Sequence, residues 1–194
     1  MPNSQKKFNF VIIGGGLIGL LTALILSKKG IKCCLIEKNK YLDNEKNSVF
    51  QPLSLNYRTI LILKKFGLWN TSLVDTYPIY SLYVKYFHNL AKLKLSSTDL
   101  NIPFLGYVVD KKSLQEYFIK SARGSKNITI IDDVEVVKIL RDEKQNEIIF
   151  KDNKAKQTHK IFCEYLILSD GSPNNLKKDL GFKYEHKDYS QISF

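Results

Sequence analysis

The sequence contains little that would support disulfide or metal chemistry. It has only three cysteines, two of them adjacent at Cys33 and Cys34, and no CxxC pair. These residues are expected to be small buried hydrophobic side chains in a reducing compartment. The three histidines, His88, His159 and His186, are far apart, and none has the spacing of metal ligands. We therefore assign no metal site and no chemistry to any histidine.

Arginine is also scarce, although the formal net charge is +11. Arginine occurs only at Arg58, Arg123 and Arg141, while the lysines are scattered along the chain. Guanidinium groups make most of the bidentate contacts with bases and phosphates, so a sequence-specific nucleic-acid partner is not expected. A solvated lysine-rich surface is the simpler interpretation, and contact with an anionic membrane surface is the alternative.

No internal repeat, low-complexity tract or linker divides the chain. Its 194 residues, of which 44% are hydrophobic, are enough for one globular domain with a core. They are few for an enzyme that needs separate cofactor and substrate domains. We therefore expect a single domain over residues 1–194, and an incomplete one.

The apolar run from Phe8 to Ser27 resembles a signal sequence or a membrane span, since it is almost uncharged and follows two lysines. Three consecutive glycines, residues 14–16, would weaken a spanning helix at its centre. The residues before them are aromatic and β-branched, which favours a strand, and Leu17 to Lys29 is rich in Leu and Ala, which favours a helix closed by Gly30. The run therefore predicts a strand followed by a helix.

A second apolar run, Ile31 to Ile36, follows and ends at Glu37. The order strand, glycine turn, helix, strand and acid is that of a dinucleotide-binding βαβ unit. Gly14, Gly16 and Gly19 match G-x-G-x-x-G, and Glu37 lies eighteen residues after the last glycine. A carboxylate at about that distance can accept hydrogen bonds from a ribose, and amides at a helix start attract phosphate. The pattern predicts dinucleotide binding.

Further elements are predicted from periodicity. We expect helices over Leu55 to Phe66 and after the capping-box pattern Ser113-x-x-Glu116, the latter stopping near Gly124. We expect a hairpin with one solvated face from a strand over Ile79 to Phe87, a turn at His88-Asn89, and alternating residues from Ala91 to Leu95. Later strands are predicted over Ile128 to Ile131, Val134 to Leu140, Glu147 to Phe150 and Tyr165 to Leu168.

The ordered segments GGGLIG, LIEK, KKFGLW, LGYVVDKKSLQEYF and LILSDGSPNNLKKDLG resemble the flavin-dependent aromatic hydroxylases. The resemblance spans nearly the whole chain and is strongest to the enzymes that hydroxylate polyprenylated ubiquinone precursors, the 2-polyprenylphenol hydroxylases. It implies an α/β fold, a Rossmann-like FAD-binding domain of the glutathione-reductase and para-hydroxybenzoate-hydroxylase type. It further implies a chain truncated before the substrate sheet and the third FAD motif of that family.

The resemblance assigns the ADP part of FAD to the glycine turn and Glu37, and the region of the pyrophosphate and the nicotinamide donor to Asp170-Gly171. Two arginines of the family are replaced by Gln51 and Lys112, and the family's Ser and Arg after Asp-Gly correspond to Asn174 and Lys177. Without the resemblance, Asp170-Gly171 and Gln51-Pro52 are ordinary turn and loop signals. The implied cofactor-binding residues are Gly14, Gly15, Gly16, Leu17, Ile18, Gly19, Glu37, Lys38, Gln51, Lys112, Val136, Asp170 and Gly171.

The implied reaction is reduction of FAD by NAD(P)H followed by hydroxylation of a lipid-soluble aromatic ring with O2. The cofactor supplies that chemistry, so we assign no catalytic residue. A carboxy-terminal half, on this or another chain, is the expected partner. The expected location is the cytoplasm, with contact at the inner face of the membrane or with a ubiquinone-biosynthesis complex as a further option. The alternative is a non-catalytic nucleotide-binding module from a split or decayed gene, which Gln51 and the missing third motif favour.

Overall fold

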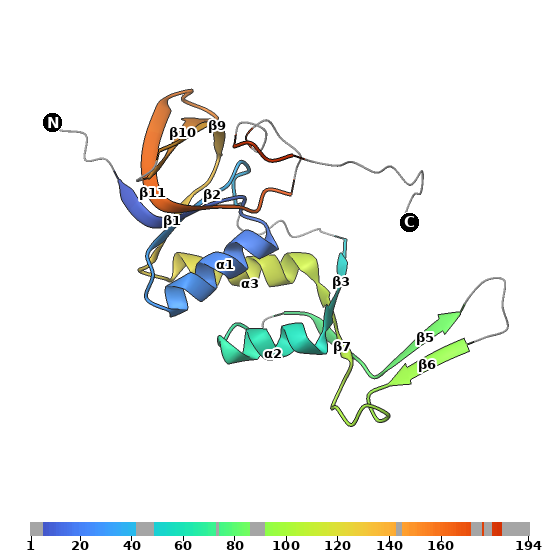
Figure 1. The fold of residues 1–194 in the computed structure, drawn as a ribbon. Coiled ribbons are helices and arrows are strands. Elements are labelled where there is room, and N and C mark those ends of the chain that lie inside the picture. The colour runs from blue at the N-terminus through green and yellow to red at the C-terminus, as the bar shows by residue number, and fades with distance from the viewer. Residues whose placement is uncertain are drawn as a thin grey trace.

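A six-stranded sheet with two helices on one face forms the centre of the computed structural model (Figure 1). The structure describes residues 6–41, 49–72, 74–85, 92–142, 145–171, 176 and 180–183. The sheet has the strand order β8-β2-β1-β11-β10-β9. Its strands are β1 (Lys7–Ile13), β2 (Cys33–Ile36), β8 (Ile128–Ile131), β9 (Val134–Arg141), β10 (Asn146–Asp152) and β11 (Thr158–Leu168).

Four neighbouring strands of this sheet, β8, β2, β1 and β11, are parallel, and β10 and β9 continue it as an antiparallel meander. Helices α1 (Leu17–Lys28) and α3 (Lys111–Arg123) follow β1 and β7 respectively and pack together on one face. The predicted α/β class and the βαβ unit of β1, α1 and β2 are therefore confirmed, as is the division of the apolar run into strand and helix.

Successive residues of the central strands serve two cores because side chains alternate across a strand. Ile12 and Leu35 pack with Leu20 and Phe118 of the helices. Val11 and its neighbours on the other face pack against the curled β9-β10-β11 meander. Burial on both faces explains why these strands read as continuous apolar runs rather than alternating ones. All three cysteines are buried and free, as expected from the sequence.

A smaller antiparallel sheet lies beside α2 (Tyr57–Lys65), with the order β3-β7-β4. Its strands are β3 (Pro52–Asn56), β4 (Thr76–Ile79) and β7 (Gly106–Asp110). The prediction of a helix over Leu55 to Phe66 is wrong at its start, because Leu55 pairs with Tyr107 in the sheet. The helix begins at Tyr57, and the Asn56 side chain caps it by accepting from the Thr59 N–H at 2.9 Å.

The predicted strand over Ile79 to Phe87 is divided at Tyr80 into β4 and β5 (Ser81–Lys85), which belong to different sheets. β5 pairs with β6 (Lys92–Ser96) as the predicted hairpin, although its turn lies outside the described residues. The prediction of one solvated face is wrong, because both faces are open. Its apolar face carries Leu82, Val84, Leu93 and Leu95, which are between 37% and 63% exposed.

Two later boundaries also differ from the sequence predictions. Helix α3 is capped by Asp110 rather than by Ser113, since the Asp110 carboxylate accepts from the Ser113 N–H at 2.8 Å. β11 begins at Thr158, well before the predicted Tyr165, because its first half pairs with β10. The helix ends near Gly124 as predicted, and Leu114, Phe118 and Ala122 form its buried face.

Candidate functional site

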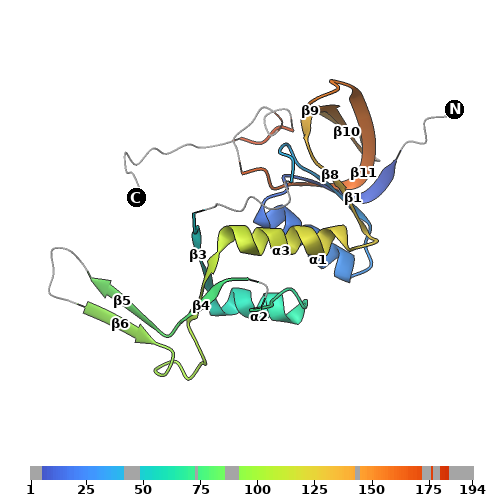
Figure 2. The ribbon, with the colours of Figure 1, turned by 180° about the vertical axis from the view of Figure 1, so that it is seen from behind.

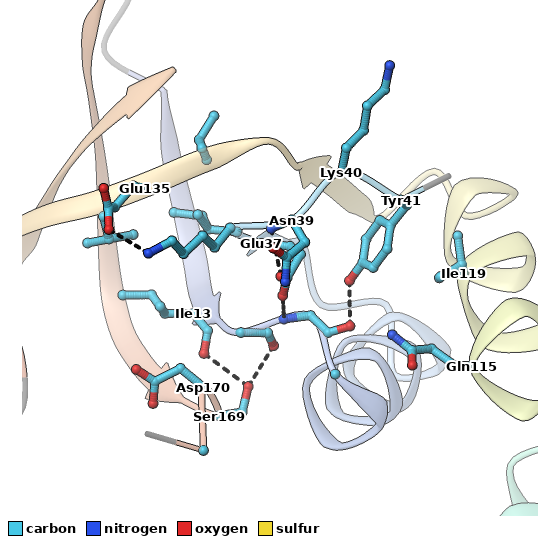
Figure 3. A pocket seen from close by; sticks show the side chains of 18 of the residues that line it. Ile13, Glu37, Asn39, Lys40, Tyr41, Gln115, Ile119, Glu135, Ser169 and Asp170 are labelled. Atoms are coloured by element: carbon cyan, nitrogen blue, oxygen red, sulfur yellow. Dashed lines mark hydrogen bonds and ion pairs between the residues drawn. The ribbon is translucent and has the colours of Figure 1, made fainter. Parts of the chain in front are cut away.

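A cleft of about 950 Å³ opens at the carboxyl ends of β1, β2 and β11 (Figure 3). The glycine turn forms one wall, the start of α3 a second, and the first residues of β9 a third. Ligands of open parallel α/β sheets bind outside the carboxyl ends of the strands. The position of the cleft is therefore that of a nucleotide site.

The glycine turn is fixed by close backbone packing. Gly14 has φ +102°, a conformation that side chains rarely adopt, and a Cβ there would collide with the backbone of Ser169 and Asp170. A Cβ on Gly19 would collide with the Gly14 carbonyl oxygen, so this glycine lets α1 approach the turn. Gly16 differs, because a Cβ there would meet no protein atom within 4 Å. The space over Gly16 is open, as an approaching ligand requires.

Glu37 lies at the end of β2 and contacts the glycine turn directly. Its Oε2 accepts from the Gly15 N–H at 2.6 Å, and its Oε1 accepts from the Asn39 N–H at 2.8 Å. Each carboxylate oxygen has two lone pairs, so both retain acceptor capacity after these bonds. The carboxylate is held at the edge of the cleft by backbone donors and can still accept from a hydroxyl pair.

Tyr41 also holds the glycine turn, through the carbonyl group of Gly15. Its side chain is only 8% exposed, and its hydroxyl donates to the Gly15 carbonyl oxygen at 2.6 Å. Its own backbone is held in turn, since its N–H donates to Asp132 Oδ2 at 2.9 Å and its carbonyl accepts from Arg123 Nη2 at 3.3 Å. Burial raises the pKa of the phenol, and the nearby Glu37 and Asp132 carboxylates raise it further, so the hydroxyl stays protonated as a donor.

The contact with Tyr41 explains the middle glycine of the turn. A Cβ on Gly15 would overlap the Tyr41 hydroxyl and crowd the Glu37 side chain. The glycine motif leaves this position free, so the sequence assigned Gly15 by resemblance only. Tyr41 itself was missed, because no local pattern connects it with a residue 26 positions earlier.

Ser169 joins the turn to the end of β11. Its N–H donates to the Ile13 carbonyl at 2.7 Å, and its hydroxyl lies 2.8 Å from the Gly14 carbonyl oxygen and 3.1 Å from that of Ile13. Asp170 follows at the cleft wall, and Gly171 adopts φ +69°. The Asp-Gly pair is therefore brought beside the glycine turn from 156 residues away.

The start of α3 forms the second wall, through Lys112, Gln115 and other residues of its first turns. Asp110 organises this end of the helix, since its carboxylate accepts from the N–H groups of Gln51 and Ser113. Burial tends to raise the pKa of Asp110, but these hydrogen bonds outweigh it and hold the pKa below its usual value. Gln51 therefore braces the helix start and does not itself line the cleft.

Most of the predicted cofactor-binding residues come together in this cleft, and four do not line it. The lining residues among them are Gly14, Gly15, Gly16, Glu37, Lys38, Lys112, Val136, Asp170 and Gly171. Leu17, Ile18, Gly19 and Gln51 lie outside the lining. Ile18 is 68% exposed at the start of α1, and Gly19 acts through packing. Asn174 and Lys177 lie outside the described residues.

Lys38 forms an ion pair with Glu135 at the rim of the cleft, with 2.8 Å between Nζ and Oε1. Both side chains are more than half exposed, so the pair contributes little to stability. The hydrogen bond with Glu135 raises the pKa of Lys38, and the same bond lowers the pKa of Glu135. The pair links β2 to β9 across the mouth of the site.

The described part of the chain contains neither a metal-binding cluster nor a membrane-spanning helix. No group of three or more His, Cys, Asp or Glu side chains there could hold a metal ion. No helix in the same residues is long and apolar enough to cross a membrane.

Comparison with known proteins agrees with this geometry. A family model described as "FAD binding domain" matches residues 7–193. The chain belongs to this FAD-binding family. FAD is therefore the cofactor indicated for the cleft.

Curated proteins with similar sequences are named as hydroxylases and monooxygenases. The 3-demethoxyubiquinol 3-hydroxylase of Escherichia coli (strain K12) is 21% identical over 192 residues, which cover 97% of this chain and 47% of that protein. The kynurenine 3-monooxygenase of Anopheles gambiae is 25% identical over 190 residues, covering 96% of this chain and 38% of that protein. The chain thus spans less than half the length of these relatives.

Among solved structures, the p-nitrophenol 4-monooxygenase of Pseudomonas putida DLL-E4 superimposes with a TM-score of 0.74. The identity is 17%, and the match covers 93% of this chain and 45% of that one. At this identity the likeness establishes the fold alone. The predicted para-hydroxybenzoate-hydroxylase type of FAD-binding fold is confirmed.

The residues in the cleft fit the ADP part of FAD. Helix α1 starts at the cleft with no side-chain cap and no acidic residue in its first turn, so its positive end faces open space over Gly16. Such a helix start favours a pyrophosphate, and the Glu37 carboxylate beside it has the acceptor capacity that a ribose hydroxyl pair would need.

Proposed function

We propose that this chain is the FAD-binding part of a flavin-dependent monooxygenase that hydroxylates the aromatic ring of a polyprenylated ubiquinone precursor. The observation that carries the proposal is the open space over Gly16 at the uncapped start of α1, beside Glu37, in a chain of the FAD-binding family. The substrate class is supported by the resemblance in sequence and by one relative named as a ubiquinol hydroxylase. The proposed electron donor is NAD(P)H.

The described residues bind and orient the cofactor in this proposal. The start of α1 holds the pyrophosphate, Glu37 accepts from the ribose, and Tyr41 keeps the turn between them in place. Bound FAD would supply the oxidation chemistry, taking electrons from the donor and activating oxygen. No described side chain is assigned as a general acid, base or nucleophile.

The ring-binding surface is proposed to come from a carboxy-terminal half, on this chain or on another. The support is that the chain spans 47% and 38% of the two relatives named above. A hydroxylase must exclude water around its substrate. Residues 1–194 should therefore bind FAD and yet form no hydroxylated product without the carboxy-terminal half. The proposed location is the cytoplasm.

The proposal is tested in two steps. The purified chain should be yellow, or should take up added FAD with quenching of flavin fluorescence. A chain that binds no FAD under either condition would contradict the assignment and favour a decayed module. With FAD bound, residues 1–194 should oxidise NAD(P)H slowly or not at all and form no hydroxylated product from a soluble phenol analogue, measured by mass spectrometry. Steady product formation by these residues alone would refute the need for a carboxy-terminal half.

A further inference from the structure

Six exposed lysines gather on the side of the molecule opposite the cofactor cleft. In Figures 1 and 2, helices α1, α2 and α3 all end on one side, away from hairpin β5-β6. Lys28 and Lys29 lie at the end of α1, Lys64 and Lys65 at the end of α2, and Lys32 and Lys126 in the segments that lead into β2 and β8. We refer to these six residues as the basic edge.

Contacts between distant segments hold the basic edge together. The hydroxyls of Ser27 and Ser125 lie 2.6 Å apart and join the end of α1 to the segment after α3. Lys29 Nζ lies 5.9 Å from the centre of the Phe66 ring, which places the end of α2 beside them. These contacts place the end of α1, the end of α2 and the segment between α3 and β8 next to one another. Lys64 extends over the Phe104 ring, with 5.5 Å between Nζ and the ring centre.

The basic edge contains no carboxylate of its own. Residues 17–36, 57–72 and 117–131 include these lysines and not one Asp or Glu. Among the described residues, no ion pair is formed by any of the six. Lysines in the last turn of a helix do favour the helix dipole. That effect accounts for the lysines at each helix end separately. It does not account for the absence of acidic residues from α1, from α2 and from the part of α3 that follows Glu116, where like charges repel one another.

Exposed aliphatic side chains lie within the same surface. Leu61 and Ile62 of α2 are 45% and 43% exposed, and the buried Leu63 separates them from Lys64 and Lys65. Aliphatic side chains beside lysines are typical of helices that lie in a membrane interface. A nucleic-acid surface would instead favour arginine forks and aromatic stacking, and only Arg58 and Arg123 occur in the three segments.

We propose that the basic edge docks this protein on an anionic lipid surface, with Leu61 and Ile62 entering the headgroup region. This inference goes beyond the proposed hydroxylase function and does not depend on it, because the surface lies apart from the cleft. The side of the molecule with the cofactor cleft then faces away from the lipid.

The test is sedimentation of the full chain with vesicles of phosphatidylglycerol and phosphatidylcholine, compared with vesicles of phosphatidylcholine alone. Binding should require phosphatidylglycerol and weaken as salt rises. Replacing Lys28, Lys29, Lys64 and Lys65 together by Gln should weaken it at least about twentyfold, since each lysine near an anionic surface contributes roughly fivefold. The matched control removes the same charge elsewhere, through Lys85→Gln, Lys94→Gln, Lys138→Gln and Lys151→Gln, and should retain most of the binding.

A second pair of variants tests the aliphatic contact with charge unchanged. Leu61→Gln with Ile62→Gln should weaken binding roughly tenfold. Leu82→Gln with Val84→Gln, equally exposed on hairpin β5-β6, should not. Circular dichroism checks that every variant folds.

Three results would overturn the proposal: equal binding to neutral vesicles, equal loss in the two lysine quartets, or loss only in the hairpin variant. Tighter binding to single-stranded RNA than to the vesicles, abolished by the basic-edge quartet, would reassign the surface to nucleic acid.

Discussion

Replacing Gly16 by valine should weaken FAD binding at least about a hundredfold and leave the fold intact. Gly16 has φ −68° and ψ −176°, which any residue can adopt, and a Cβ there meets no protein atom within 4 Å. The folded chain therefore has room for the side chain, and the only expected cost is a poorer helix cap, about 1 kcal/mol. The added methyl groups would occupy the space through which a pyrophosphate reaches the start of α1.

The loss of affinity follows from the hydrogen bonds that would no longer form. A hydrogen bond to a charged group is worth about 1.5–3 kcal/mol, so the loss of two amide contacts to the pyrophosphate costs about 3–6 kcal/mol. The dissociation constant for FAD should rise at least about a hundredfold. The measurement is a titration that follows quenching of flavin fluorescence, with urea unfolding measured in parallel.

Gly30→Ala is the matched control, because it should give the opposite pair of results. Gly30 also has open space around its Cβ position, but its φ is +76° and it follows α1 at the end away from the cleft. Alanine in this left-handed conformation should cost about 1–2 kcal/mol of stability with no change in FAD affinity. A folded Gly16→Val chain that binds FAD within about threefold of the parent would show that the pyrophosphate lies elsewhere.

Two further variants test the supports of the cleft. Tyr41→Phe removes the donor to the Gly15 carbonyl and should lower the free energy of unfolding, and it should weaken FAD binding about fivefold. The control is Tyr165→Phe, at a residue that is 59% exposed, and it should change neither quantity. Equal effects in the two variants would show that Tyr41 does not support the site. Asp110→Ala should lower the free energy of unfolding at pH 7 by about 1–2 kcal/mol through loss of the α3 cap. Because the folded pKa of Asp110 is lowered, its stabilisation is present above the unfolded pKa and is lost as the pH falls through the folded value. Urea unfolding should therefore show the difference between parent and variant shrinking below about pH 4, and a difference independent of pH would contradict the assignment.

The central fold could be predicted because its signals are local and strong. Apolar runs of strand length, a glycine turn and the Leu-rich helix specify β1, α1 and β2 within about 30 residues. The boundaries failed where tertiary pairing decided the structure. Leu55 fits a helical spacing but pairs with Tyr107, and the first half of β11 is a strand because β10 lies beside it.

The sequence predicts the glycine motif of the cofactor site but not the distant residues that hold this motif in place. The spacing of Gly14, Gly16 and Gly19 reports contacts made within one βαβ unit. Tyr41 and Ser169 reach the same turn from 26 and 155 residues away, and neither has neighbours in sequence that would distinguish it from any other Tyr or Ser. Such contacts depend on the closed fold, so only the three-dimensional arrangement identifies them.

The clustering of the lysines could not be predicted from the sequence either. They are scattered along the chain, and their positions in sequence do not show which of them lie together in space. In a parallel α/β sheet the helices run antiparallel to the strands, so residues at helix ends and at strand starts meet at one edge. Lys28 and Lys32 are far from Lys126 in sequence, and this topology brings them to the same edge. FAD binding at the cofactor cleft depends on close contacts that a single substitution can break. Lipid binding at the basic edge depends on the summed charge of its lysines. Single lysine replacements there should accordingly have small effects that accumulate, in contrast to the abrupt loss expected at Gly16.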